Sequence, residues 1–107
     1  MFTRKVECEA RVGKREELTN RVTSDVLPIL QQQPGFVDLI ALSDDAQPEH
    51  MVYLSFWKSK QDAQQYHGEK YEQIVKMIKP LLTDVPIVQN LRVEVSTSHQ
   101  IAPSKAA

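Results

Sequence analysis

The chain has 107 residues, which is enough for one domain with a single modest core. Its 13 basic and 14 acidic residues give a formal net charge of -1. This balance argues against a nucleic-acid-binding surface and gives no reason to expect a membrane partner. Because Cys8 is the only cysteine, an internal disulfide and a cysteine-based zinc site are excluded. The chain shows no signal-peptide pattern and no long apolar run, so we expect a cytoplasmic protein.

The first predicted element is a strand from Phe2 to Val12. Apolar and polar residues alternate along it, and period-two alternation is typical of a strand with one buried side. Arg4 is the only residue that breaks the apolar side. Gly13 and Lys14 end the strand.

A helix is predicted next, from Arg15 to Gln33. Its apolar stripe has helical spacing and consists of Leu18, Val22, Val26 and Leu30. Pro28 lies inside this stripe and removes one backbone hydrogen bond, so we expect a bend between Ser24 and Pro28. The pair Pro34-Gly35 ends the helix.

Two strands joined by a polar hairpin loop follow, over residues 36–43 and 50–57. Both sides of these strands are largely apolar. A sheet with one solvated face would alternate apolar and polar residues instead. Helices can cover one face, and the chain has no further element for the other, so we expect a second copy of the protein to cover it.

The second helix is predicted to begin at Ser59, which forms a capping-box pattern with Asp62. Gly68 could divide this helix into two pieces. A last strand follows, from Ile87 to Val95. The order β-α-β-β-α-β predicts an α+β, ferredoxin-like fold with an antiparallel four-stranded sheet. We expect one domain over residues 1–97 and a flexible tail over 98–107.

Aromatic side chains are the strongest chemical signal. Trp57, Tyr66, His67 and Tyr71 lie close together in the sequence, whereas no phosphate loop or metal-ligand spacing is present. No metal or cofactor is therefore expected. Such a group could stack on a flat substrate, and a tyrosine hydroxyl or an imidazole could remove a phenolic proton. The alternative is that Trp57 and Tyr71 are core residues, with Tyr66 and His67 partly exposed.

Over residues 2–97 the sequence resembles the antibiotic-biosynthesis monooxygenase family of dimeric α+β-barrel proteins. The resemblance rests on Gln33-Pro34-Gly35-Phe36, on Tyr53-Leu54-Ser55-Phe56-Trp57-Lys58-Ser59 with Asp62-Ala63, and on Tyr66-His67 followed by Tyr71. It implies a homodimer whose sheets pack face to face, and a pocket between each sheet and its helices. Some members oxygenate quinol-like or polycyclic aromatic substrates with molecular oxygen and no metal or flavin.

Other proteins of this fold degrade haem, using an Asn on the first strand and a Trp and a His on the second helix. The matching positions here are Val6, Tyr66 and Lys76, and none of them carries the required side chain. Haem degradation is therefore disfavoured.

The resemblance thus predicts a cofactor-independent monooxygenase for a small aromatic or quinol-like substrate. Tyr66 and His67 would orient or deprotonate the substrate, and Trp57, Tyr71 and Tyr53 would line the pocket. The alternative is a non-catalytic dimer of the same fold that binds a small molecule or has a regulatory role. A roomy pocket with Tyr66 or His67 pointing inward would favour an enzyme or a ligand carrier.

Overall fold

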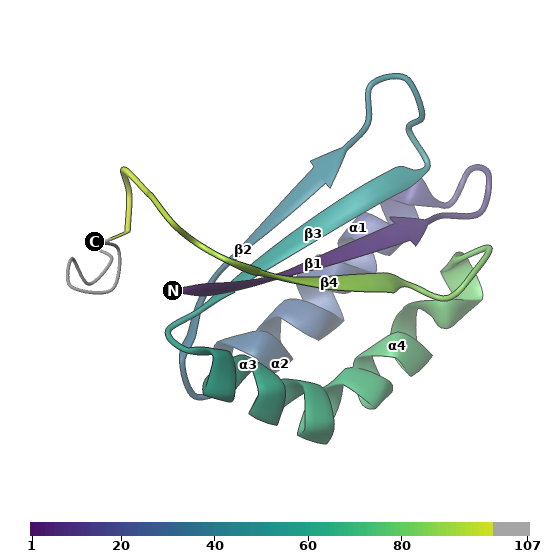
Figure 1. Cartoon of the computed structure of the whole chain (residues 1–107). Helices are drawn as coiled ribbons and strands as arrows, with labels where there is room; N and C mark the ends of the chain where they lie inside the picture. The colour runs from purple at the N-terminus through teal and green to yellow at the C-terminus, as the bar shows by residue number, and fades with distance from the viewer. Residues whose placement is uncertain (100–107) are drawn as a thin grey trace.

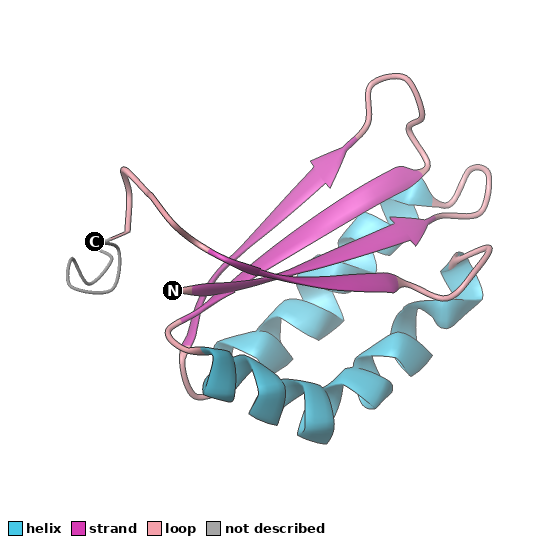
Figure 2. Cartoon of the chain, viewed as in Figure 1, coloured by secondary structure: helices cyan, strands magenta, loops and turns pink. Residues whose placement is uncertain are grey.

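The computed structural model describes residues 1–99, which form a sheet layer and a helix layer. The strands are β1 (Phe2–Glu9), β2 (Phe36–Ser43), β3 (His50–Trp57) and β4 (Ile87–Arg92). The helical segments are α1 (Arg15–Arg21), η1 (Val22–Val26), α2 (Leu27–Gln31), α3 (Lys60–Tyr66), η2 (His67–Tyr71), α4 (Glu72–Ile78) and η3 (Lys79–Leu81). All of them cover the same face of the sheet (Figure 1). Figure 2 shows the two layers by colour.

The sheet is antiparallel, with the strand order β2-β3-β1-β4. This order confirms the predicted α+β, ferredoxin-like arrangement. The predicted bounds of β2 and β3 are also confirmed. Both strands have strongly apolar sequences that end at turn residues, which makes their limits easy to recognise.

The predicted first and last strands of the chain were too long, because the end of a strand depends on its pairing with neighbouring strands. β1 was expected to reach Val12, but its ladder ends at Glu9. The next amide, that of Ala10, donates to the Glu49 carbonyl at 2.8 Å, which lies in a loop. β4 was expected to reach Val95 but ends at Arg92, because Arg92 pairs with Phe2, the first residue of β1.

The helical segments form two long helices, the first from α1, η1 and α2 and the second from α3, η2, α4 and η3. Each long helix contains one π-helical turn. The first, η1, lies directly before Pro28, so the irregularity predicted between Ser24 and Pro28 is present in this form. A π turn shifts the hydrogen-bond register and places the proline in the first turn of the next segment, where its missing amide costs little. The second, η2, contains Gly68. This turn divides the helix into α3 and α4, as predicted for Gly68, and its flanking residues keep right-handed helical angles.

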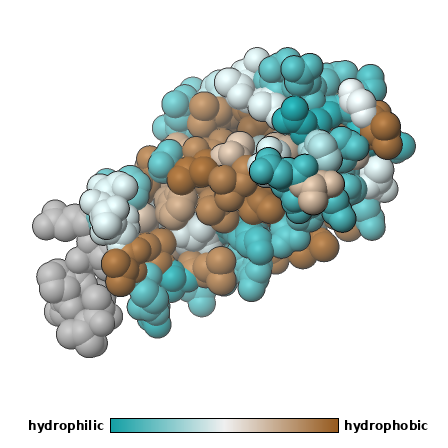
Figure 3. All heavy atoms as spheres, turned by 90° about the horizontal axis from the view of Figure 1, so that it is seen from above, coloured by the Kyte–Doolittle hydropathy of each residue, from teal (hydrophilic) through white to brown (hydrophobic). Residues whose placement is uncertain are grey.

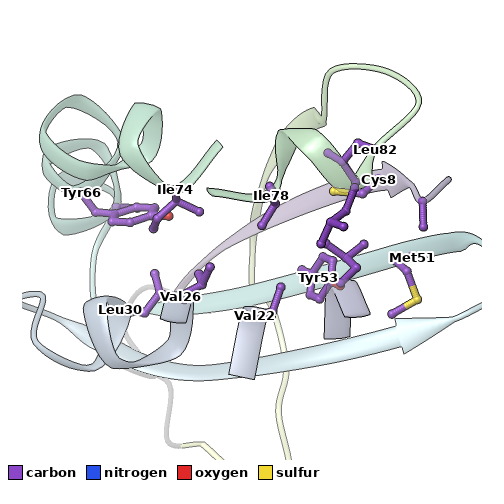
Figure 4. Packing of buried hydrophobic residues seen from close by; sticks show 14 of the residues in the cluster. Cys8, Val22, Val26, Leu30, Met51, Tyr53, Tyr66, Ile74, Ile78 and Leu82 are labelled. Atoms are coloured by element: carbon purple, nitrogen blue, oxygen red, sulfur yellow. The ribbon is translucent and has the colours of Figure 1, made fainter. Parts of the chain in front are cut away.

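The core lies between the sheet and the helices. Along β3, residues 51, 53, 55 and 57 are buried and the intervening ones are half-buried. Figure 4 shows Tyr66 and Ile74 of the second long helix facing Val26 and Leu30 of the first. None of the helices within residues 1–99 is both long and apolar enough to cross a membrane.

On the opposite face of the sheet β2 and β3 are also apolar, as the two-sided strands predicted, whereas β1 places the ion-paired Lys5 and Glu7 there. The register places Ile40 beside Leu54 and Leu42 beside Val52 on this face. Ile40 is 39% exposed and Leu42 46% exposed. We call this surface the open face. Figure 3 shows the molecule from above, where apolar side chains gather between polar ones.

The predicted tail, residues 98–107, lies outside the described residues from residue 100 onward. His99 packs against Phe56, with ring centroids 6.1 Å apart, and its Nε2 lies 3.9 Å from Asp38 Oδ2. The described end of the chain therefore reaches β2 and β3 on the open face.

Candidate functional site

Three separate sequence motifs meet at one corner of the molecule. Gly35 has φ +78°, and a Cβ placed there would collide with the Asp62 side chain. The Gly35 carbonyl accepts a hydrogen bond from the Lys58 amide at 2.8 Å. Ser59 Oγ accepts one from the Asp62 amide at 3.1 Å, which confirms the predicted helix cap. The loop after the first long helix therefore fixes the turn from β3 into α3.

Aromatic rings fill the inside of this corner. Phe36 meets Trp57 edge to face, with centroids 5.6 Å apart. Trp57 is completely buried and its Nε1 donates to Ser55 Oγ at 3.0 Å. Tyr66 stacks on Trp57, with centroids 4.9 Å apart and an interplanar angle of 26°. Trp57 therefore lies behind Tyr66 and positions it.

A buried arginine lies against these rings. Arg4, on β1, is only 2% exposed. Its guanidinium carbon is 4.6 Å from the centroid of Tyr71 and 5.1 Å from that of Tyr66. No ion pair among residues 1–99 includes Arg4. The faces of the two tyrosine rings therefore supply much of the electrostatic compensation for this charge.

His67 contacts Arg4 from the outer side. Arg4 Nη2 lies 2.8 Å from His67 Nδ1, and the imidazole stacks on Tyr71 with centroids 4.9 Å apart. A guanidinium only donates hydrogen bonds, so Nδ1 accepts and the proton of the neutral ring is on Nε2. Partial burial, and then the positive charge of Arg4, lower the pKa of His67 below its usual 6.5. His67 is thus neutral at pH 7, and its basic lone pair is occupied by Arg4.

The tyrosines of the site remain protonated at neutral pH. Burial raises the pKa of Tyr66 to about 12, although the charge of Arg4 opposes the shift. Burial likewise raises the pKa of Tyr71. The hydroxyls of Tyr53 and Tyr71 are buried without a hydrogen-bond partner in the described part of the protein. These groups can donate hydrogen bonds to a ligand, but none of them is a base at pH 7.

Two spaces meet at Arg4. The inner cavity, of about 50 Å³, lies between the helices and the sheet. It is lined by Arg4, Val6, Val22, Val26, Leu30, Leu39, Tyr53, Ser55, Tyr66, Tyr71, Ile74 and Ile78. It is smaller than the ~150 Å³ cavity that holds benzene in an engineered protein. The outer hollow, of about 320 Å³, is lined by Phe2, Arg4, Ala63, Gln64, His67, Val88 and Asn90.

The predicted site residues therefore divide into three positions. Tyr53, Tyr66 and Tyr71 line the inner cavity, His67 lines the outer hollow, and Trp57 lines neither space. Arg4, which joins the two spaces, was missed as a site residue. Its signal in the sequence was an arginine on the apolar side of a strand, because such a position is buried and a buried charge needs a partner.

Other chemical groups lie outside this site. Cys8 is buried, and burial raises the pKa of its thiol to about 12, so it is an inert core thiol at neutral pH. Lys76 is exposed and pairs with Glu72 at 3.6 Å, so it does not face the cavity that Val6 and Tyr66 line. Within residues 1–99 no group of His, Cys, Asp or Glu side chains is arranged to hold a metal ion.

Solved structures with the same fold include three relatives of low sequence identity. A monooxygenase from the gene ActVA-Orf6 of Streptomyces coelicolor, in complex with nanaomycin D, is 16% identical with a TM-score of 0.76; the match covers 89% of this chain and 88% of that one. SnoaB of Streptomyces nogalater, a cofactor-independent oxygenase, is 14% identical with a TM-score of 0.75, covering 92% and 97%. A conserved protein of Methanosarcina mazei is 18% identical with a TM-score of 0.72, covering 86% and 92%.

No curated protein matches the chain in sequence. The structural likenesses show a shared fold. The family model described as antibiotic biosynthesis monooxygenase matches residues 1–75, which is most of the chain. These residues include the buried arginine and every aromatic side chain of the corner, and on this match the chain belongs to the antibiotic biosynthesis monooxygenase family.

Proposed function

We propose that the protein is a cofactor-independent monooxygenase that acts on a small aromatic, quinol-like substrate. The observation that carries the proposal is the corner itself: a buried cation and buried tyrosine hydroxyls surround the inner cavity and adjoin an outer hollow. Family membership supports the reaction type. Concave sites that combine apolar walls with a few polar groups are typical of small-molecule binding.

The reaction would use the substrate as its own electron source. For an anthrone-like ring, a CH₂ group becomes C=O: one oxygen atom of O₂ bonds to the carbon, and the other leaves as water with both hydrogens. The substrate supplies all four electrons. The first step is loss of a proton to give a carbanion or a phenolate, which reacts with oxygen.

In this proposal the residues have distinct roles. His67 accepts the substrate proton at Nδ1 once Arg4 no longer occupies that nitrogen. The protonated Tyr66 and Tyr71 can then donate hydrogen bonds to the negative charge that develops on the substrate oxygen. Tyr53 forms the floor of the cavity, and Trp57 positions Tyr66 from behind.

Oxygen consumption with anthrone and a panel of hydroquinones tests the proposal. We expect uptake above the buffer rate with at least one of them and a loss of about 10²-fold or more in His67→Ala, which removes the base. Gln73→Ala is the matched control, since Gln73 is exposed on α4 and lines neither space. Uptake at the buffer rate with every compound contradicts the proposal for these substrates.

A non-catalytic binding dimer is the second candidate. Two observations favour it: the inner cavity is small, and the His67 lone pair is already used by Arg4. The same experiment discriminates between the two, because a carrier binds aromatic compounds without consuming oxygen.

We also propose that two copies associate through the open face. Ile40, Leu42 and Leu91 are 39%, 46% and 40% exposed on this face, and apolar patches of this kind are typical of interfaces. Sedimentation at micromolar concentration should give a dimer, and Leu42→Glu should give a monomer. Val12→Glu is the control, because Val12 is 89% exposed but lies beyond the sheet. A monomeric wild type contradicts the proposal.

A further inference from the structure

We propose that Arg4 is the binding residue for an aromatic carboxylate, which enters through the outer hollow. The proposal deepens the proposed function, and rests on it for the aromatic nature of the ligand. The carboxylate follows from the charge and the geometry around Arg4.

Arg4 is a buried cation without a buried anion. Its side chain is 2% exposed, and within residues 1–99 its guanidinium makes one side-chain hydrogen bond, to the neutral His67. Tyr66 and Tyr71 lie against its guanidinium carbon. A guanidinium has five N–H donors directed along its edges, and the hydrogen bond to His67 uses one of them, so donors remain for a planar acceptor. A carboxylate matches this fork with two parallel hydrogen bonds.

The surroundings of Arg4 exclude acidic side chains. The sequence has 14 acidic residues, yet neither the inner cavity nor the outer hollow is lined by Asp or Glu. Lys58 and Lys60 line a neighbouring hollow that shares Phe2 and Asn90 with the outer one. Basic side chains therefore line both hollows, which favours an anionic ligand there.

The outer hollow has the shape and polarity for the ring. Phe2, Ala63 and Val88 provide apolar walls, and Gln64 and Asn90 add amide groups that can donate or accept. Its volume of about 320 Å³ falls in the range of small-molecule pockets, whereas the inner cavity of about 50 Å³ does not. The ring would lie in the hollow with its carboxylate at Arg4.

Binding of the carboxylate has a consequence for His67. The carboxylate competes for Arg4 Nη2, whose acceptor is now His67 Nδ1. A charged acceptor forms the stronger hydrogen bond, so the ligand releases the imidazole lone pair. In a substrate that carries an acid group, this group thereby frees the base that the proposed reaction uses.

Calorimetric titration with 2-naphthoate and with 2-naphthamide tests the proposal without oxygen turnover. The two probes have nearly the same shape and differ in charge. We expect wild type to bind 2-naphthoate at least tenfold more tightly than 2-naphthamide. In Arg4→Met, which keeps the length and removes the charge, this preference should fall to near unity. Arg11→Met is the control, since Arg11 is exposed beyond β1 and outside both spaces.

The wild-type comparison needs no variant, so it stands even if Arg4→Met fails to fold. Equal affinity for both probes, or no binding of either at millimolar concentration, overturns the proposal. A preference that persists in folded Arg4→Met also overturns it. Oxygen uptake is measured separately: tight naphthoate binding without any uptake leaves Arg4 as a carboxylate site and removes only the enzymatic claim.

Discussion

The layer between the sheet and the helices has two ends of different character. The aliphatic end contains Cys8, Met51 and Leu82, all at most 3% exposed (Figure 4). The aromatic corner contains Arg4, Tyr66 and the other rings around Trp57. Here Arg4, Trp57 and Tyr66 are equally buried, but their burial includes a positive charge, and the hydroxyl of Tyr71 has no partner in the described residues.

The difference indicates where stability and function lie. At the aliphatic end Cys8, Met51 and Leu82 bury uncharged, largely apolar side chains, so their burial stabilises the fold directly. At the aromatic corner the burial of Arg4 carries a desolvation penalty, which two tyrosine rings and one imidazole only partly offset. Charged groups in such environments are concentrated at functional sites. Substitutions at the two ends should therefore separate folding from binding.

The largest effect is expected from Leu82→Ala at the aliphatic end. Leu82 is 3% exposed and forms an isolated bridge with Ala10 just after β1. Its truncation leaves a cavity, so the free energy of unfolding in urea should fall by about 2–5 kcal/mol. Binding of 2-naphthoate to the folded fraction should not change. A loss below about 1 kcal/mol, or weakened binding by folded protein, would show that the two ends are not independent.

Gly35→Ala should have the next largest effect, at the aromatic corner. The positive φ and the collision with Asp62 predict a loss of about 1–3 kcal/mol in the free energy of unfolding. Gly68→Ala is the matched control. Gly68 lies in a helix with no atom within 4 Å of its Cβ position, so the alanine should stabilise by up to about 1 kcal/mol. Equal effects of the two substitutions would contradict the role given to Gly35.

A smaller effect is expected at the helix cap. Ser59→Ala removes the acceptor of the Asp62 amide and should cost about 1 kcal/mol in thermal or urea unfolding. Ser24→Ala, at an exposed position within η1, should be neutral or slightly stabilising. If both substitutions are neutral, the cap does not hold the β3–α3 turn in solution.

The sequence predicted the fold well because its signals are local. The alternating pattern of β1, the apolar runs of β2 and β3 and the cap at Ser59 each define an element within a few residues. The failures were at the ends of β1 and β4, where the partner strand decides the limit. The division of the second helix at Gly68 is present as the π turn η2 between α3 and α4.

The candidate site was predicted less completely. The aromatic residues of the second long helix were recognised by their spacing, but sequence spacing does not tell which side of a helix meets a cavity. Tyr66 and His67 are neighbours, yet Tyr66 is 4% exposed and His67 lies on the outer side. Arg4 is distant in sequence, and only the pairing of β1 with β3 brings it to the corner. Its break in the apolar pattern was the one available signal.

The smallest predicted effect is the pH dependence of stability that arises from His67. Its pKa in the folded state is lower than the usual 6.5, because of burial and then the charge of Arg4. The unfolded chain therefore binds the proton more readily, and the free energy of unfolding should decrease as the pH falls through about 6.5 toward the folded-state pKa. His67→Gln keeps an acceptor for Arg4 but cannot titrate. The difference in the free energy of unfolding between wild type and this variant, from about pH 7.5 to about pH 5, cancels the contributions of other titrating groups.

A wild-type decrease no larger than that of the variant would mean that Arg4 does not hold His67 in its neutral form. The base would then be free without a ligand, and the charge of the substrate would matter for affinity alone.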